Sequence, residues 1–247
     1  MVLDFGNNKL VFDENYELRC TRDELLVLYW QFHPRFRFVK TCAGGKFLDV
    51  GSGNGGLQFW REWEKPERKD IIMYGTDLQK GEYADRYHDF KIMDFNEDNF
   101  PYDKYFFDNV FSAHVMEHLE NPANLIRNID KILRSGGYVY IEQPNHNSVL
   151  APKKDMFVAA GIKCATTTTN FYDDKTHIQP YAVDEIISLF QKYAESKFEI
   201  IESGTIWNNY LKDAMFAYAY QNQDTEIWTY ATWLHYQWSD YVMLKKM

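Results

Sequence analysis

The chain has 247 residues, a length that suits one large α/β domain or one domain with an appendage. Its formal net charge is -9, and an acidic surface repels phosphate backbones and anionic lipid headgroups. Nucleic acid and membranes are therefore not expected as main partners. The three cysteines are far apart and show neither a redox pair nor a zinc spacing, and the first ten residues lack the pattern of a secretory signal. We expect a cytoplasmic protein.

The first element predicted along the chain is a helix. The run Thr21-Arg22-Asp23-Glu24 forms a capping-box pattern, and apolar residues continue from it to Tyr29. Pro34 should end or bend this helix. We assign residues 1–40 to an N-terminal helical cap.

The next segment pairs a strong strand with a glycine-rich loop. Residues 46–50 have the apolar character of a buried strand, and glycines follow at once at Gly51, Gly53, Gly55 and Gly56. A helix is expected from Leu57 to about Glu64. Glycines between a strand and a helix allow the backbone to approach a ligand closely.

Strands and amphipathic helices alternate through the rest of the chain, which predicts βαβ units and a mainly parallel sheet. Asn121-Pro122 and Val183 are expected to open helices. We assign residues 41–222 to one α/β domain and 223–247 to a C-terminal aromatic helical arm. The further strands are predicted at 71–77, 90–94, 107–112, 138–142, 198–206 and 214–220, and the tail 225–246 is expected to be helical.

The glycine loop alone does not identify its ligand. Gly51, Gly53 and Gly56 also satisfy the dinucleotide pattern G-x-G-x-x-G. Asp49 argues against that ligand, because a carboxylate beside an anionic pyrophosphate costs Coulomb energy. S-adenosylmethionine (SAM) has no phosphate, and its sulfonium and ammonium groups favour an acidic neighbour.

Carboxylates also end the next two strands. Asp77 is placed to accept hydrogen bonds from ribose hydroxyls, a role found with nicotinamide cofactors as well as with SAM. Asp94 can accept from the adenine amino group, and the ring or amide of Phe95 can meet the adenine. The alternative for Asp94 is a strand-end residue that caps a turn.

These segments together resemble a known family. The run from Phe47 to Gly55 is similar to motif I of the class I SAM-dependent methyltransferases. The later motifs follow in the same order, at 74–77, 93–95, 107–118 and 133–141. Five motifs in the correct order are far more specific than one. The resemblance covers residues 45–145 closely and 176–206 more loosely.

The resemblance implies a Rossmann-like, doubly wound sheet of seven strands, mostly parallel with an antiparallel last strand. SAM would lie across the carboxyl ends of the strands, and S-adenosylhomocysteine (SAH) would be the product. The cofactor-binding residues implied are Asp49, Gly51, Ser52, Gly53, Gly55, Asp77, Leu78, Asp94, Phe95 and His114.

The acceptor side is less defined. Methyl transfer needs sulfur, carbon and nucleophile in line, and a hydroxyl acceptor must also lose a proton. His177 resembles the histidine that faces the acceptor in ubiquinone-type and glycan-modifying O-methyltransferases, and it is our first choice for the base. Ala182 departs from that pattern, because those relatives have Ser or Thr there. His114 is the second candidate, and His118 is interpreted as structural or pocket-lining.

Other polar and aromatic residues leave alternatives open. The run 142–145 borders the expected pocket, but loop-end polar residues explain it equally well. Asp173-Asp174 could ligate Mg²⁺, although adjacent acidic residues in a loop are usually solvated, and we predict no metal. The aromatic tail, with Trp228, Trp233 and Trp238, is interpreted either as buried core or dimer contact or as a lid over a carbohydrate.

We therefore expect an O-methyltransferase acting on a hydroxyl of a sugar, glycan precursor or small polar metabolite. N- or C-methylation of a small molecule is the alternative within enzymes. A non-catalytic SAM-binding subunit and a nicotinamide enzyme are the alternatives from other classes. A homodimer is left open.

Overall fold

The computed structural model describes residues 1–16 and 20–247, which form two compact units. Unit 1 comprises residues 1–33, 144–180 and 205–240, and unit 2 comprises 34–143, 181–204 and 241–247. Each unit is assembled from separated stretches. The predicted division into 1–40, 41–222 and 223–247 is continuous and includes 17–19, which lie outside the described residues, so it stays a prediction. None of the described helices is long and apolar enough to cross a bilayer.

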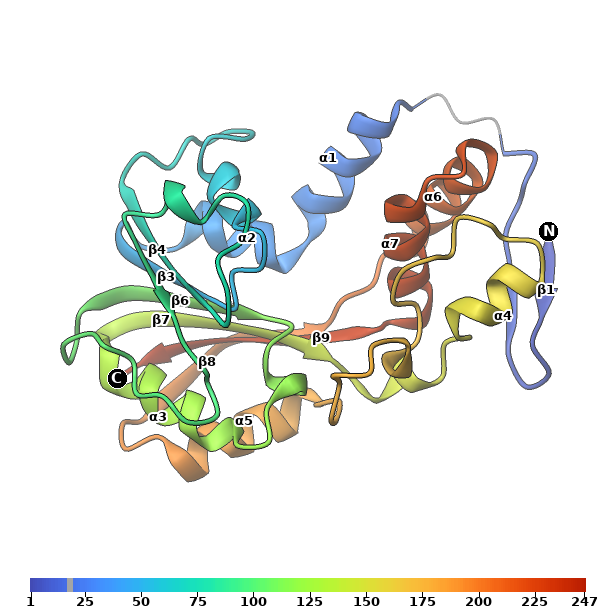
Figure 1. Ribbon diagram of the computed structural model, residues 1–247. Coiled ribbons are helices and arrows are strands. Elements are labelled where there is room, and N and C mark those ends of the chain that lie inside the picture. Colours follow the sequence, from blue (N-terminus) through green and yellow to red (C-terminus); the bar gives the residue numbers. More distant parts are fainter. Residues whose placement is uncertain (17–19) are drawn as a thin grey trace. The chain divides into compact units, whose positions relative to one another are not determined.

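A seven-stranded sheet with the order β5-β4-β3-β6-β7-β9-β8 organises unit 2 (Figure 1). The strand order reverses direction between β3 and β6, which is the switch point of a doubly wound fold. The strands are β3 (Gly45–Val50), β4 (Ile71–Asp77), β5 (Asp89–Ile92), β6 (Phe107–Ala113), β7 (Leu133–Pro144), β8 (Phe198–Thr205) and β9 (Ser239–Lys246).

The first five strands of this sheet are parallel, as predicted. In the register, Asp49 of β3 lies opposite Gly75 of β4 and Phe111 of β6, and Ala113 of β6 lies opposite Glu142 of β7. The carboxyl ends of β3, β4, β6 and β7 therefore meet at one edge of the sheet.

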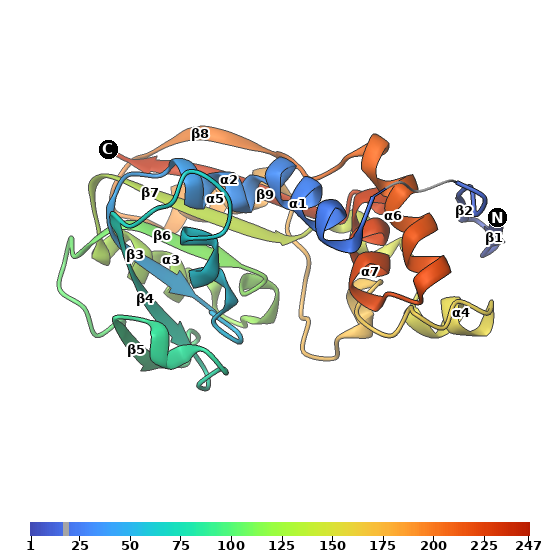
Figure 2. The ribbon, with the colours of Figure 1, turned by 90° about the horizontal axis from the view of Figure 1, so that it is seen from above.

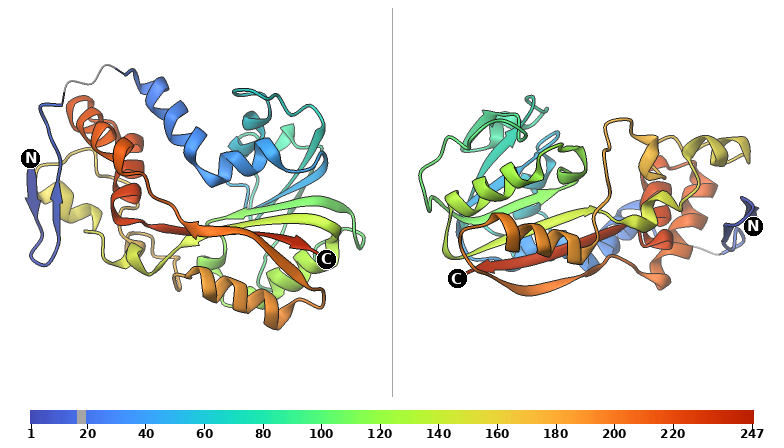
Figure 3. Two further views of the ribbon diagram at one scale, coloured as in Figure 1. Left: turned by 180° about the vertical axis from the view of Figure 1, so that it is seen from behind. Right: turned by 90° about the horizontal axis from the view of Figure 1, so that it is seen from below.

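The strand β9 is antiparallel to both of its neighbours. The Asn145 N–H donates to the Trp238 carbonyl, while Lys246 at the other end of β9 donates to the Leu133 carbonyl beside the start of β7. The Met247 N–H donates to the Lys197 carbonyl at the start of β8. In Figure 3 the red strand β9 runs beside the orange strand β8 toward the C-terminus. The predicted fold class is confirmed.

Helices cover both faces of the sheet in unit 2. Residues 38, 47, 111 and 140 form a stack of aromatic rings between α2 (Pro34–Thr41) and one face. On the other face, Leu48 and Val110 pack with α3 (Pro122–Ile132) and α5 (Val183–Tyr193). The alternation of apolar side chains along β3 thus supplies both layers of the core.

The helix starts that the sequence indicated are mostly present. The capping box at Thr21 forms, with the Glu24 N–H donating to Thr21 Oγ1 and the Thr21 N–H donating to Glu24, and it opens α1 (Arg22–Phe32). Asn121 does precede α3, but its side chain makes no capping hydrogen bond. The helix expected after the glycine loop is only a 3₁₀ segment, Gly56–Arg61.

Two predictions near the C-terminus are wrong. The segment 214–220 is not a strand but the interior of α6 (Asn209–Asn222), because Asn208 caps the helix and its alanines favour it. The tail 225–246 is not one helix. It forms α7 (Thr225–Tyr236), which ends at Gln237 in the left-handed region, and then the strand β9.

Unit 1 is built on the α6–α7 pair, which lie side by side in Figure 2. A small hairpin of β1 (Val2–Asp4) and β2 (Lys9–Val11) and the helix α4 (Lys154–Ala159) belong to the same unit. Trp228 is fully buried among the rings of Phe12, Phe157 and Phe216. Much of the aromatic tail is therefore core, and Trp228 does not face a sugar.

Candidate functional site

The glycine loop after β3 is fastened to the end of β4. The Gly53 N–H donates to Asp77 Oδ2 at 2.8 Å, and the Gly51 and Ser52 N–H groups donate to the Thr76 carbonyl. Gly51 has φ +71°, and a Cβ there would lie 2.2 Å from Val115 Cγ2. Gly53 has φ +54° and open space within 4 Å of the same position. The loop is thus packed tightly at Gly51 and open at Gly53, where a ligand can approach the backbone.

Asp49 is buried beneath this loop, and its surroundings control its charge. Asp49 is only 2% exposed, and its Oδ2 accepts a hydrogen bond from the Tyr87 hydroxyl at 2.5 Å. Burial raises the pKa of Asp49 to about 7, although the Tyr87 hydrogen bond and the Arg35 charge act in the opposite direction. A cation bound near Asp49 would favour its ionised form.

The remaining cofactor candidates differ in their exposure and in their contacts. Leu78, beside Asp77, is 63% exposed. Asp94 Oδ1 accepts from the Asn96 N–H at 2.9 Å, which is the turn-capping role left open by the sequence. The Phe95 ring is buried and packs on Phe100, so of the two adenine contacts expected from Phe95, the ring is taken up by the core.

His114 lies between two buried carboxylates just after β6. Its Nδ1 is 3.3 Å from Glu117 Oε1, and its Nε2 is 3.3 Å from Glu142 Oε1. The residue has φ +57°, a left-handed conformation that is uncommon outside glycine and clusters at functional sites. Burial lowers the pKa of His114, but hydrogen bonds to Glu117 and Glu142 raise it, and the net shift is upward. Each ring nitrogen thus faces a carboxylate oxygen, which favours the protonated imidazolium.

Glu142 joins this array to α2 through a two-pronged ion pair. Arg35 donates from Nε to Glu142 Oε2 at 3.1 Å and from its terminal nitrogen to Oε1, and the Tyr140 hydroxyl donates to Oε2 at 2.7 Å. Glu142 is 1% exposed. A buried carboxylate held by a guanidinium and a hydroxyl is compensated and rigid.

Three further buried polar side chains in unit 2 lack such compensation. Ser112 Oγ, Glu117 Oε2 and both amide atoms of Gln143 have no hydrogen-bond partner within the described part of the chain, while Glu117 Oε1 faces His114 Nδ1 at 3.3 Å. All three residues are completely buried and lie at or just after the carboxyl ends of β6 and β7. Buried polar groups are normally satisfied, so an unsatisfied set at a strand edge indicates a place where a polar ligand or water binds.

His177 lies in unit 1, where its ring is fixed by its own loop. Nδ1 is 2.7 Å from the Phe171 carbonyl oxygen, and the centroids of the Phe171 ring and the imidazole are 4.6 Å apart. A ring nitrogen that faces a carbonyl carries the hydrogen, so the lone pair is on Nε2. Asp174 Oδ2 is 3.9 Å from Nε2.

The acidic pair before His177 is used by the fold. Asp173 Oδ2 accepts from the N–H groups of Thr169 and Asn170 and from Thr169 Oγ1, and Lys154 N–H also donates to this carboxylate. Asp174 Oδ1 accepts from Thr176 N–H and Oγ1. These carboxylates accept from donors of the polypeptide instead of being simply solvated as expected, and the absence of a magnesium site stays a prediction.

Sequence reasoning missed several residues of this site. Tyr87, which holds Asp49, lies after a short 3₁₀ turn, and nothing in its local sequence connects it to β3. Arg35 was not among the predicted site residues, and its partner Glu142 is 107 positions away. Glu117 and Gln143 stood inside recognised runs, but their burial without partners depends on the tertiary structure.

Comparison with protein families matches residues 28–194 to the family described as a methyltransferase domain. This match spans most of the chain, and the chain belongs to that family. It is a SAM-dependent methyltransferase, and SAM is its cofactor. No curated protein matched the chain.

Solved structures share the fold at low sequence identity. A chain of the complex between the Haloferax volcanii Trm112 methyltransferase activator and a methyltransferase is 15% identical with a TM-score of 0.58, covering 96% of this chain and 98% of that one. The SAM-dependent methyltransferase of Mesorhizobium loti is 15% identical with a TM-score of 0.54, over 86% of this chain and 96% of that one. That of Archaeoglobus fulgidus is 19% identical with a TM-score of 0.51, over 90% and 94%.

Proposed function

We propose that this enzyme transfers the methyl group of SAM to a hydroxyl of a sugar, a glycan precursor or another small polar metabolite. The observation that carries the proposal is the buried polar array of His114, Glu117, Glu142 and Gln143 at the ends of β6 and β7. Burying such groups is costly unless they meet a polar partner, and a hydroxyl-rich acceptor supplies donors and acceptors together.

The cofactor side of the proposal rests on the strand-end carboxylates. Asp49 would favour the cationic methionine end of SAM, and Asp77 would accept from the ribose hydroxyls while it still holds the Gly53 N–H. Asp94 and the Phe95 amide would meet the adenine. Gly51, Ser52, Gly55 and Leu78 complete the proposed cofactor contacts.

The proton of the acceptor hydroxyl would pass to His177. Its Nδ1 faces a carbonyl oxygen, which leaves Nε2 as the accepting nitrogen, the arrangement required of a general base. His114 would have a different role. Both of its nitrogens face carboxylates, so it would act as a donor and as a rigid counter-charge, and it would not accept the proton.

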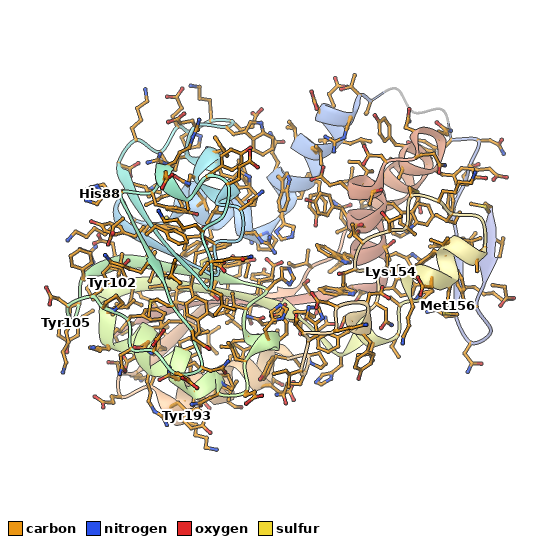
Figure 4. The ribbon with its side chains drawn as sticks, in the orientation of Figure 1. His88, Tyr102, Tyr105, Lys154, Met156 and Tyr193 are labelled. Carbon is orange, nitrogen blue, oxygen red and sulfur yellow. The ribbon has the colours of Figure 1, made fainter. Side chains whose placement is uncertain are left out.

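The test is formation of SAH over a panel of hydroxyl and amine acceptors with the wild type and His177→Ala. For the hydroxyl acceptor that reacts best, the variant should turn over about 10²- to 10⁴-fold more slowly, the range of general-base catalysis. Its SAM affinity should stay within about twofold. His88→Ala is the matched control, because His88 is an exposed histidine of unit 2 (Figure 4). Unchanged turnover in His177→Ala would reject the assignment of the base.

N-methylation is the second candidate, and Glu117 favours it. Its Oε2 has no hydrogen-bond partner among the described residues, and a buried carboxylate of this kind suits an amine acceptor, which brings N–H donors and can leave a proton on the carboxylate before methylation. In that case Glu117→Gln should abolish activity toward amines, and His177→Ala should have little effect. Activity confined to hydroxyl acceptors in the panel would remove this candidate.

A further inference from the structure

A cavity of unit 2 lies away from the residues proposed to bind SAM. It has a volume of about 260 Å³ and is lined by the loop after β5, the helix α3, the turn between α5 and β8, and the end of β9. Tyr105 and Lys131, which line it, precede the first residues of β6 and β7. The cavity is therefore at the amino ends of these parallel strands, whereas Asp77, His114 and Gln143 are at carboxyl ends.

The side chains that line this cavity carry a net positive charge. Its lining includes four cationic side chains, Lys104, Arg127, Lys131 and Lys246, against the two carboxylates Asp130 and Glu195. In a chain of net charge -9, such a cluster opposes the overall charge. It therefore creates a local field that attracts anions.

Asp130 and Lys246 neutralise each other and do not contribute to this excess. Lys246 Nζ is 2.9 Å from Asp130 Oδ1, and both side chains are buried. Asp130 Oδ2 also accepts from the N–H groups of Glu195 at 2.7 Å and Ser196 at 3.0 Å. Burial raises the pKa of Asp130, but the hydrogen bonds to Lys246 and Ser196 outweigh it and lower the pKa. This buried ion pair therefore has a structural role.

The other three cations are available to a ligand. Lys104, Arg127 and Lys131 form no ion pair with any carboxylate among residues 1–16 and 20–247. Lys131 in the last turn of α3 is partly explained by the helix dipole. Lys104 is on a loop, so the dipole does not account for it.

Two tyrosines and a rigid loop give the cavity its walls. Tyr105 is 61% exposed and lies on the Lys246 ammonium, 4.9 Å from ring centroid to Nζ, while the Arg127 guanidinium is 5.2 Å from the Tyr193 ring. Figure 4 labels both tyrosines. The buried Asn128 holds the adjoining loop, because its Oδ1 accepts from the Phe100 N–H and its Nδ2 donates to the Asp98 carbonyl.

We propose that this cavity is a binding site for a phosphate-type dianion, either inorganic phosphate or the phosphate group of a small monoester. Three cations, two of them lysines, surround a space large enough for a phosphate with a small organic group. Arg and Lys form charge-assisted hydrogen bonds to phosphate oxygens, and the tyrosine rings offer flat faces to the organic part. The site would be separate from the methyl-transfer site, and it does not depend on the proposed acceptor.

The experiment is calorimetric titration of the full chain with inorganic phosphate at low ionic strength. The wild type should show one saturable site, sulfate should compete for it, and acetate should bind at least tenfold more weakly. Lys104→Glu/Lys131→Glu should weaken phosphate binding at least tenfold. Lys153→Glu/Lys163→Glu, which changes the net charge equally at exposed positions of unit 1, should stay within about twofold.

Two outcomes would overturn the proposal. One is the absence of a saturable phosphate site in the wild type. The other is an equal loss in both double variants, which would show a general charge effect. Titration with glycerol phosphate distinguishes the two sources, because a site for monoesters should bind it more tightly than inorganic phosphate. SAH affinity, measured on the same samples, should be the same in all three proteins, so failure of the methyltransferase proposal would be seen separately.

Discussion

Asp173 of unit 1 and Asp49 of unit 2 are carboxylates in opposite surroundings. In unit 1, Asp173 accepts hydrogen bonds from three groups of its own loop and from the Lys154 N–H at the start of α4. In unit 2, Asp49 has a single tyrosine donor, and Glu117 Oε2 has none among the described residues. A carboxylate saturated by the polypeptide stabilises the fold. A buried carboxylate left without donors lowers stability until a ligand meets it, which is the mark of a binding site.

The largest expected effect concerns Asp173, whose carboxylate is saturated with hydrogen bonds. Asp173→Ala removes an acceptor shared by three main-chain N–H groups and one hydroxyl, and it should lower the free energy of unfolding by about 3 kcal/mol. Urea denaturation measures this loss. Asp155→Ala, at an exposed position in the first turn of α4, is the control and should cost less than about 1 kcal/mol. Equal losses in the two variants would mean that Asp173 is not a structural acceptor.

A second prediction concerns the pH dependence of SAM binding through Asp49. The pKa of this carboxyl in the free protein is about 7, because burial disfavours its charge. A cationic ligand favours the ionised form, so below pH 7 a proton must leave on binding. SAM affinity should therefore rise about tenfold between pH 5.5 and pH 7 and level off above it. Isothermal titration calorimetry measures the affinity at each pH.

Asp49→Asn is the control for that experiment. The amide cannot titrate, so the affinity of the variant should be weaker and nearly constant over the same pH range. An identical slope in the variant and the wild type would assign the pH dependence to another group. It would also remove Asp49 from the proposed contacts.

The smallest expected effect concerns Gln143, a buried residue of unit 2 with an unsatisfied amide. Gln143 is fully buried, and neither amide atom has a partner in the ranges that the structure describes. Gln143→Met keeps the shape of the side chain and removes the orphaned polar atoms, so it should raise the free energy of unfolding by about 1 kcal/mol. The same variant should weaken binding of the acceptor. A destabilised Gln143→Met protein would show that the amide is satisfied in solution and is not held for a ligand.

The sequence predicted those parts of the fold that depend on local patterns. The capping box at Thr21 and the apolar strands 46–50 and 71–77 are where they were expected, and the turn after Val50 carries the predicted glycines. The segment 214–220 was mistaken for a strand because its aromatic residues have high strand propensity. Asn208, six positions earlier, caps a helix, and the segment is helical. The strand β9 was missed because its apolar run follows a helix without a strong turn signal.

The candidate site was predictable only in part. Residues that act through the backbone of a motif, such as Gly51 and Gly53, were found from their spacing. Tyr87 on Asp49 and Arg35 on Glu142 depend on contacts between distant parts of the chain, which no local pattern encodes. The burial of the Phe95 ring likewise follows from its packing on Phe100 in the core.

The central claim is that carboxylates at successive strand ends bind a cationic nucleoside that has no phosphate. Calorimetry of the full chain with SAM and with NAD, under identical buffer conditions, tests this claim directly. We expect SAM to bind at one site per chain and NAD to give no measurable heat. Tight binding of NAD with no heat from SAM would contradict the account.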